Sequence, residues 1–479
     1  MSELEAIRAL VREKAGIISD INRQIWSYAE GGYAEYRSCE KLVSVLEAEG
    51  FSVRRGAAGI ETAFIAEYGS GHPVIGITAE YDSLPGLSQQ AGEAVKIPVE
   101  EGANGHGCGH SALSAGSAGA AVVIAAWLRE KGISGTVRLF GTPAEESGFG
   151  KVFMAKAGCF DGVDAVFTWH PGDMNAVSFN RMTANLRIRY DFRGVAAHAA
   201  AAPDRGRSAL DACELMNVGV NYLREHVPSS VRMHYAYLDC GGTAPNVVQD
   251  HASLLYIIRA PKLSTVSEVA ARVDDVARGA ALMSGTEVAI RKQGGMSDVI
   301  PNPSLCRVIS ECMQEAGGPE FTSGDYETAA RFMNAIPEET RAKLIRDGAA
   351  LNGISEEEFE KRPLNTAVRL MDESRRNFVV SASSDVGDLS YLVPTAQFNA
   401  AVCIPSTAVH TWQMTAQVGT GIGDRGAAWA ALIIAMSCAK VFLDPSIAEK
   451  AKSELTEETR GEYVSPLPDD VTPDMFRNI

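Results

Sequence analysis

Apolar residues in the first part of the chain alternate between the spacing of helices and that of strands. The pattern predicts helices over residues 3–29 and 36–49, followed by apolar strands that end at Asp82, Thr142 and His170. Alternating helices and buried strands are typical of an α/β sheet. We therefore expect an α/β domain at the start of the chain.

The pattern changes at residue 183, where a self-contained α+β unit of βαββαβ order begins. Its predicted elements are a strand at 183–192, a helix at 208–224, strands at 231–240 and 252–260, a helix at 264–283 and a strand at 286–293. Beyond Pro301 the α/β character returns, with a helix at 305–316, a strand at 397–404 and a helix at 424–441. We predict a discontinuous α/β domain, 1–182 and 295–479, that carries an inserted α+β domain, 183–294. The charged, helix-forming stretch 320–374 is predicted to be a surface insertion.

Length and charge narrow the class of protein. A chain of 479 residues is too long for one ordinary core, which agrees with at least two domains. Hydrophobic residues make up 46% and charged residues 22% of the sequence, the balance of a globular protein. The net charge of −16 and the lack of any Lys/Arg-rich run argue against a nucleic-acid partner.

Targeting and membrane signals are weak. The most apolar segment, 119–128, is too short and too rich in small residues for a membrane span, so we expect a buried helix. The first 16 residues mix acids and bases in a helical pattern, unlike a signal peptide. Nine cysteines without paired spacing suggest free thiols. These features predict a cytoplasmic protein.

Three candidate motifs lie where predicted strands end, the edge of an open α/β sheet at which ligands bind. GITAEYDSLPG brings Asp82 into a Pro/Gly-rich loop, although such a carboxylate is more often a turn or cap residue. VRLFGTPAEES ends in Glu145 and Glu146, whose side chains leave the backbone in different directions. One could hold a metal while the other reaches an attacking water. VDAVFTWHPGD ends at His170, which taken alone could be a core histidine.

Two further motifs complete a candidate metal site. The glycine-rich loop GANGHGCGH carries His106, Cys108 and His110 and opens an Ala-rich helix. Glycines let such a loop fold tightly enough for imidazole and thiolate groups to converge. PSTAVHTWQ adds His410 before the last long helix. Thiolate, imidazole and carboxylate groups together suit Zn²⁺ or Mn²⁺.

The order of these motifs resembles the M20 metallopeptidase family, in its amidohydrolase branch. The resemblance covers nearly the whole chain and includes AEYDSLPGLSQ, GHGCGH, TPAEE, TWHPGD and SSDVGDLSYLVPT. It implies two divalent metal ions, Mn²⁺ or Zn²⁺, with Cys108 as a bridge between them. It also implies Glu145 as the general base and Asp82 as the carboxylate that orients a ligand. The implied metal ligands are Cys108, His110, Glu146, His170 and His410.

Two positions depart from the family pattern. Many branches carry a histidine two residues before the motif aspartate, whereas this chain has Glu80, so a ligand from this strand is in doubt. The position after His110, often Asp or Asn in related sequences, is Ser111, so its supporting hydrogen bond is expected to differ.

The insert also contains residues that match the family. FRGVAAHAAAAPDRGRSALDA matches the lid motif, which implies that His198 reaches the partner subunit's site and polarises the scissile carbonyl. GGTAPNVV similarly gives Asn246 as a substrate contact. Arg259 is a candidate clamp for a substrate carboxylate, with a structural ion pair as the alternative. His234 is a further candidate for facing the substrate.

The resemblance implies hydrolysis of an amide between an acyl or aroyl group and an amino acid, with p-aminobenzoyl-glutamate as the first candidate substrate. Indoleacetyl-amino acids, N-benzoyl amino acids and dipeptides are the alternatives. A different class of function is a non-catalytic subunit of a heteromeric hydrolase. The insert, with a free strand edge, predicts at least a dimer, either a homodimer or a heteromer with a homologous subunit.

Overall fold

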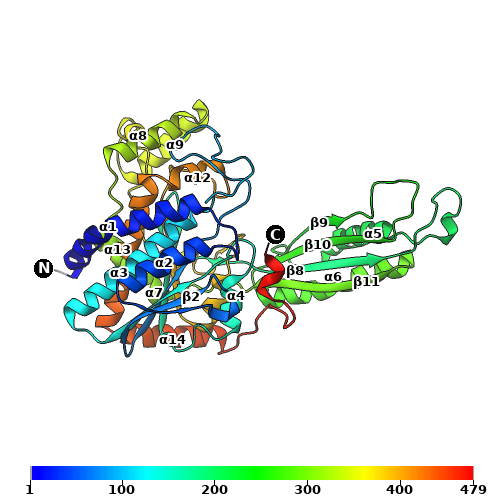
Figure 1. Ribbon diagram of the computed structural model, residues 1–479, viewed down its shortest axis with the longest axis horizontal. Coiled ribbons are helices and arrows are strands. Elements are labelled where there is room, and N and C mark those ends of the chain that lie inside the picture. Colours follow the sequence, from blue (N-terminus) through cyan, green and yellow to red (C-terminus); the bar gives the residue numbers. More distant parts are fainter. Residues whose placement is uncertain (1–2, 478–479) are drawn as a thin grey trace.

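The computed structural model describes residues 3–477 and contains two main sheets (Figure 1). The larger sheet has eight strands, and a four-stranded sheet projects to one side of it. In spatial order, the larger sheet consists of β1 (Ser52–Arg55), β2 (Phe64–Ser70), β4 (Gly135–Gly141), β3 (Val74–Ala79), β5 (Ala165–Gly172), β14 (Thr395–Ala401), β6 (Asn175–Ser178) and β12 (Val368–Arg369).

The centre of the larger sheet is parallel. β3 pairs in parallel with both β4 and β5, and β5 pairs in parallel with β14. The carboxyl ends of these four strands therefore meet at one edge of the sheet. The loops that carry the candidate chemistry leave from this edge.

Side chains of the central strands alternate between two hydrophobic cores. In β5, Phe167 and Trp169 belong to one cluster, whereas Val166 belongs to another. Such strands, buried on both faces, require long apolar runs, as the sequence has. The first core is shared by α1 (Glu3–Tyr28), α2 (Tyr36–Ala48), α3 (His110–Lys131), α7 (Pro303–Ala316), α13 (Gly421–Leu443) and α14 (Ser446–Thr459), and the second by α4 (Gly150–Lys156) and α11 (Val386–Leu392).

Two helices, α3 and α13, are long and apolar enough to cross a membrane by length and composition. Their most apolar windows are 100% and 83% buried inside the fold, and the two helices pack against each other. They are core helices of the α/β unit, as the sequence predicts for residues 119–128.

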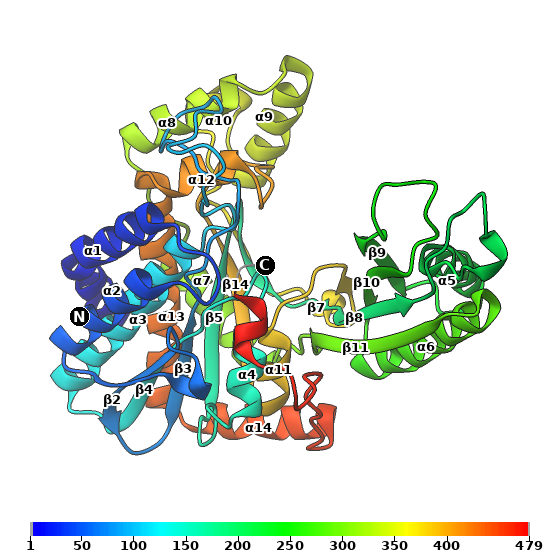
Figure 2. The same cartoon turned by 45° about the vertical axis from the view of Figure 1, so that its right-hand side comes forward.

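The inserted unit has its own sheet and its own core. Its sheet order is β11-β8-β10-β9, antiparallel throughout, and buried side chains of its two helices and its strands form a separate hydrophobic cluster. β9 lies at one edge of this sheet and is largely exposed. The elements are β8 (Ala184–Arg193), α5 (Ala209–Leu223), β9 (Arg232–Asp239), β10 (His251–Ala260), α6 (Leu263–Ser284) and β11 (Glu287–Met296), and the short parallel pair β7 (Arg181–Met182) and β13 (Val379–Val380) lies beside its entrance (Figure 2).

The charged stretch after α7 folds into a small helical segment, which we define as α8 (Ser323–Asn334), α9 (Glu338–Asn352) and α10 (Glu356–Lys361). It lies above α12 (Trp412–Val418) in Figure 2. Phe332, Met333 and Leu344 of the segment pack against Ile404 and Ala416. The segment is therefore attached to the loop that carries His410.

Predicted and observed elements differ mainly at their ends. β3 ends at Ala79, so Asp82 lies in the following loop rather than in the strand, while β5 continues past His170 to Gly172. All nine cysteines are free, as predicted, and eight of them are buried.

Substitution of Gly116 tests the close packing of α3. A Cβ atom at Gly116 would lie 2.8 Å from Trp169 and 2.9 Å from the carbonyl oxygen of Ala427. We expect Gly116→Ala to destabilise the protein by about 1–3 kcal/mol through overpacking. Gly16→Ala in α1 is the matched control, because nothing lies within 4 Å of its Cβ position. Thermal unfolding should show a lower midpoint for Gly116→Ala and an equal or higher midpoint for Gly16→Ala. Equal stability of the two variants would contradict the packing argument.

Candidate metal centre

Two groups of metal-binding side chains meet at the carboxyl edge of the parallel strands, and they share one residue. In the first group, the ligand atoms of Cys108, His110 and His170 lie within 4.8 Å of one another. In the second, the ligand atoms of Cys108, Glu146 and His410 do so. The Cys108 sulfur thus lies between two sets of donors. This arrangement brings together all five ligands expected from the sequence.

The donor atoms are close enough to share cations. Cys108 Sγ lies 3.4 Å from His170 Nε2, and His410 Nε2 lies 3.1 Å from Glu146 Oε1. His110 Nε2 and Glu146 Oε1 are buried and make no hydrogen bond of acceptable geometry. Buried polar atoms without partners are costly, and a bound cation would satisfy both. A thiolate, three imidazoles and a carboxylate fit divalent transition metals.

Proton equilibria also favour a bound cation. Burial raises the pKa of the Cys108 thiol, so without a cation the sulfur stays protonated. Burial alone would raise the pKa of Glu146, but the hydrogen bond from His410 and the charge of His110 lower it below its ordinary value. Burial lowers the pKa of His170, which keeps this imidazole neutral and able to bind a metal.

Glycines bring the Cys108 loop close to its neighbours. A Cβ atom at Gly107 would lie 2.4 Å from the Leu87 side chain, and one at Gly109 would lie 2.8 Å from Pro171. Gly109 also has a φ of +82°, the left-handed region that favours glycine. His106 of the same loop points elsewhere, with Nε2 2.9 Å from the carbonyl oxygen of Ile25.

Asp82 joins two of the motifs. Its Oδ1 lies 2.8 Å from His110 Nδ1, and its Oδ2 accepts a 2.9 Å hydrogen bond from the Glu146 backbone N–H. The first contact orients the His110 ring so that Nε2 faces the cluster, as outer carboxylates do at metal sites. The Oγ of Ser111 is buried without a partner, so it supplies no such support.

A strained turn separates the two adjacent glutamates from the strand before them. Ala144 has a φ of +56°, and its N–H donates a 2.9 Å hydrogen bond to Glu35 Oε1. Burial and the charge of Asp82 raise the pKa of Glu35 to about 8. Sequence analysis missed Glu35, which is 109 residues away from Ala144 along the chain.

Glu145 points into the cavity from this turn. Its Oε1 accepts a 2.9 Å hydrogen bond from the Ser384 hydroxyl. Burial and the neighbouring charge of Glu80 raise the pKa of Glu145 well above its ordinary value. A carboxyl group with a raised pKa is suited to take a proton and to return it.

A buried lysine compensates the acidic groups behind Glu145. Lys151 Nζ lies 2.7 Å from Glu80 Oε1 and 2.5 Å from Asp385 Oδ1, and all three side chains are fully or almost fully buried. Glu80 Oε2 also approaches His110 Nε2 at 3.3 Å, without hydrogen-bond geometry. Sequence analysis missed Lys151 and Asp385. The available signal was a lone lysine in the apolar segment GKVFMA directly after the glutamate pair.

The metal-binding side chains open into a cavity of about 660 Å³. Cys108, Glu145, His170 and His410 line its floor, and Arg259 of the inserted unit lines it as well. Arg259 Nη1 donates a 2.8 Å hydrogen bond to Ser383 Oγ. Within residues 3–477, no acidic side chain lies within ion-pair distance of Arg259, so the structural ion pair considered from the sequence is not formed.

The other candidates from the insert lie outside this cavity. His198 and Asn246 are exposed neighbours on two paired loops, since the N–H of Ala199 bonds to the carbonyl oxygen of Asn246. His198 Nδ1 accepts from the N–H groups of Ala200 and Ala201, at 3.2 and 3.1 Å. His234 lies on exposed β9, opposite Ile257. None of the three lines the cavity within the described part of the chain.

Comparison with known proteins agrees with this architecture. The fold and the site together define a metal-dependent hydrolase. The chain belongs to peptidase family M20/M25/M40, whose family model matches residues 76–374. One of the two polypeptides of the p-aminobenzoyl-glutamate hydrolase of Escherichia coli K12 is 40% identical over 458 residues, 95% of each chain. The Xaa-Arg dipeptidase of Mus musculus is 31% identical over 341 residues, 68% of this chain and 74% of the relative.

A solved structure supports the fold and the number of metals. A dinuclear metal-binding peptidase of the M20 family from Bacillus subtilis superposes with a TM-score of 0.60 at 17% identity, covering 90% of this chain and 99% of that chain. The expected α/β fold with an inserted α+β unit is confirmed. The family fold and the two ligand groups sharing Cys108 support binding of two divalent cations.

Removal of Lys151 tests its role in compensating buried charge. We expect Lys151→Met to destabilise the metal-free protein by about 3–5 kcal/mol, because Glu80 and Asp385 lose their buried cation. Adding Asp385→Asn should recover part of this loss. Urea unfolding followed by circular dichroism measures both effects, with Lys343→Met, at a lysine of α9 far from the site, as the matched control. If Lys151→Met unfolds at the same urea concentration as the unsubstituted protein, the proposed charge balance is wrong.

Proposed function

We propose that this protein hydrolyses the amide bond between an acyl or aroyl group and an amino acid with a free α-carboxylate. The best candidate substrate is p-aminobenzoyl-glutamate. The observation that carries the proposal is the pair of ligand groups that share Cys108, directly beside Glu145 in a cavity that also contains Arg259. The name of the Escherichia coli relative, 40% identical over 95% of the chain, supports this substrate.

Each side chain of the cavity has a proposed task. Cys108, His110, Glu146, His170 and His410 hold the metals, with Cys108 as the bridge. Bound divalent ions would lower the pKa of a water molecule and polarise the scissile carbonyl. Glu145 takes the proton of the attacking water and returns it to the leaving amine, for which its raised pKa is suitable. Asp82 orients His110 through their 2.8 Å contact.

Substrate recognition is proposed to combine both parts of the fold. Arg259 binds the free carboxylate of the amino acid, because a guanidinium group can hold a carboxylate through two hydrogen bonds. Its position in the cavity and its lack of an acidic partner within residues 3–477 support this role. His198 and Asn246 act in the cavity of a second chain, where His198 polarises the carbonyl. Their exposure on one chain supports a contribution in trans.

We further propose the assembly, domain division and location. The catalytic domain comprises 1–182 and 295–479, and the lid and dimerisation domain comprises 183–294, a division that the separate hydrophobic cores support. The exposed edge strand β9 favours pairing with a second copy or a homologous chain. Nine free thiols favour the cytoplasm. The metal is Mn²⁺ or Zn²⁺.

The substrate class is tested with a panel of amides. Metal-loaded protein should hydrolyse p-aminobenzoyl-glutamate with the highest kcat/KM, ahead of indoleacetyl-aspartate, N-benzoyl amino acids and dipeptides. The metal-free protein is reloaded separately with Mn²⁺ and Zn²⁺ to find the more active ion. Activity on unblocked dipeptides alone would reject the proposed substrate. Absence of both metal and activity, restored by a homologous partner, would instead favour a non-catalytic role for this chain.

Glu145→Gln tests the general base. The variant should retain its bound metal, because Glu145 belongs to neither ligand group that contains Cys108. Its kcat should fall by about 10²–10⁴-fold, the usual contribution of a general base. Metal content and steady-state rates are compared with those of Glu130→Gln, at an exposed glutamate of α3. Near-normal turnover with metal bound would show that another group takes the proton.

A complementation experiment tests the contribution of His198 between chains. His198→Ala and Glu145→Gln chains should each be inactive alone. Mixed under conditions that permit exchange of chains, they should recover partial activity, since one site of a mixed dimer combines an intact Glu145 with an intact His198. If exchange is independently verified and no activity returns, His198 acts within its own chain or not at all.

A further inference from the structure

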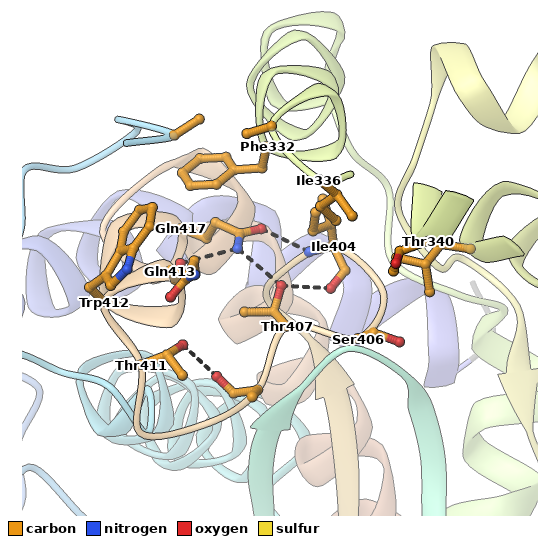
Figure 3. Close-up of a pocket in the computed structure, with 14 residues that line it drawn as sticks. Phe332, Ile336, Thr340, Ile404, Ser406, Thr407, Thr411, Trp412, Gln413 and Gln417 are labelled. Carbon is orange, nitrogen blue, oxygen red and sulfur yellow. Dashed lines mark hydrogen bonds between the residues drawn. The ribbon is translucent and has the colours of Figure 1, made fainter. Parts of the chain in front are cut away.

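A second cavity, of about 320 Å³, lies between the helical segment and the loop that carries His410 (Figure 3). Phe332 and Ile336 face it from the helical segment, and Ile404 and Trp412 face it from the other side. None of the residues that line it is charged. Its size and apolar, aromatic walls are those of a small-molecule site, which typically encloses roughly 300–1,000 Å³.

The second cavity adjoins the metal-side cavity through one short loop, residues 406–411. Thr407 lines both cavities. Ala408 and Thr411 face the second cavity, whereas Val409 and His410 face the metal-side cavity. Thr407 and His410 are three residues apart, which limits their separation to about 11 Å along the chain. A substrate held at the metal ligands is therefore within reach of the second cavity.

This loop is fixed before any ligand binds. The fully buried Gln417 accepts a 2.9 Å hydrogen bond from the Ile404 N–H, and its amide donates 3.1 Å hydrogen bonds to Thr407 Oγ1 and the Gln413 carbonyl. The N–H of His410 donates a 2.7 Å hydrogen bond to the Gly107 carbonyl. The shared wall is thus held in place, and binding there requires little ordering of the chain.

We propose that the second cavity is the subsite for the acyl side of the substrate and that it selects neutral aromatic acyl groups. This inference rests on the proposed function. The amide lies at the metal ligands, the free carboxylate faces Arg259, and the aromatic ring passes Thr407 to pack between Phe332 and Trp412. Rings are bound well by aromatic walls, and a charged acyl group would lose its hydration there without a compensating partner.

The helical segment is therefore a specificity element. Phe332 and Ile336 line the cavity from its side, so the chemistry of the acyl group is read by a part of the chain that lies far from Cys108 and Glu145 in sequence. A small acyl group such as acetyl would not reach this cavity. Its hydrolysis depends on the metal-side residues alone.

The test fills the cavity from its exposed rim. Ala335 lines the cavity and is exposed, so Ala335→Trp introduces a large side chain without disturbing the buried core. Ala342→Trp is the matched control, because Ala342 is exposed on α9 and does not line the cavity. The measured quantity is the ratio of kcat/KM for p-aminobenzoyl-glutamate to that for N-acetyl-glutamate. We expect this ratio to fall by at least about tenfold in Ala335→Trp and to stay unchanged in Ala342→Trp.

A binding measurement separates this inference from the proposed reaction. Calorimetric titration of metal-loaded Glu145→Gln with p-aminobenzoyl-glutamate should show at least about tenfold weaker binding when Ala335→Trp is added. Weaker binding without any turnover by the unsubstituted enzyme would support the subsite and reject the reaction. An unchanged ratio and unchanged binding would overturn the subsite. Equal losses for the aroyl and acetyl substrates would also overturn it, because the cavity would then act on the His410 loop rather than on the acyl group.

Discussion

The site depends on an excess of buried negative charge at one edge of the parallel sheet. Charged groups in a protein interior cost several kcal/mol each unless they are paired. Within residues 3–477, Lys151 is the buried lysine that pairs with two of these groups. Its ammonium group neutralises the inner part of the cluster, and the outer part remains for a bound cation. The carboxyl groups are those of Glu80, Asp82, Glu145, Glu146 and Asp385.

This division of charge gives the two ends of the cluster different roles. The inner end is a closed ion-pair network whose partners come from β3, α4 and α11 and the short loops next to them. The outer end contains Cys108 and the unpartnered atoms of His110 and Glu146, and it opens into the cavity. Glu145 lies between the two, which is where a group that gains and loses a proton is useful. The inserted unit supplies Arg259 to this cavity, and the helical segment supplies walls of the second cavity.

Much of the architecture follows from local pattern. The predicted helices at 3–29 and 36–49 correspond to α1 and α2, and the βαββαβ order of the insert agrees with β8 to β11. Long amphipathic helices and buried apolar strands are specified by their own residues. Strand ends were less predictable, since a one-residue change in pairing leaves the local pattern almost unaltered.

The site was predictable only in part. The five proposed ligands belong to recognisable motifs, and the structure brings them together. Lys151 and Asp385 could not be inferred, because the partners are 234 residues apart and neither lies in a motif with metal-ligand spacing. Glu35 was missed for the same reason. Local sequence says that such a residue is charged, but only the tertiary fold says that it is buried and what it compensates.

The central claim is that Cys108 bridges two divalent ions, and X-ray absorption at the zinc edge of fully Zn²⁺-loaded protein tests it most directly. A bridging thiolate predicts a sulfur shell at about 2.3 Å from every zinc ion, together with nitrogen and oxygen neighbours at about 2.0–2.2 Å. It also predicts zinc–zinc scattering at about 3.5–4 Å, as in other two-metal sites. A spectrum that lacks both the sulfur shell and the zinc–zinc contribution would contradict the account.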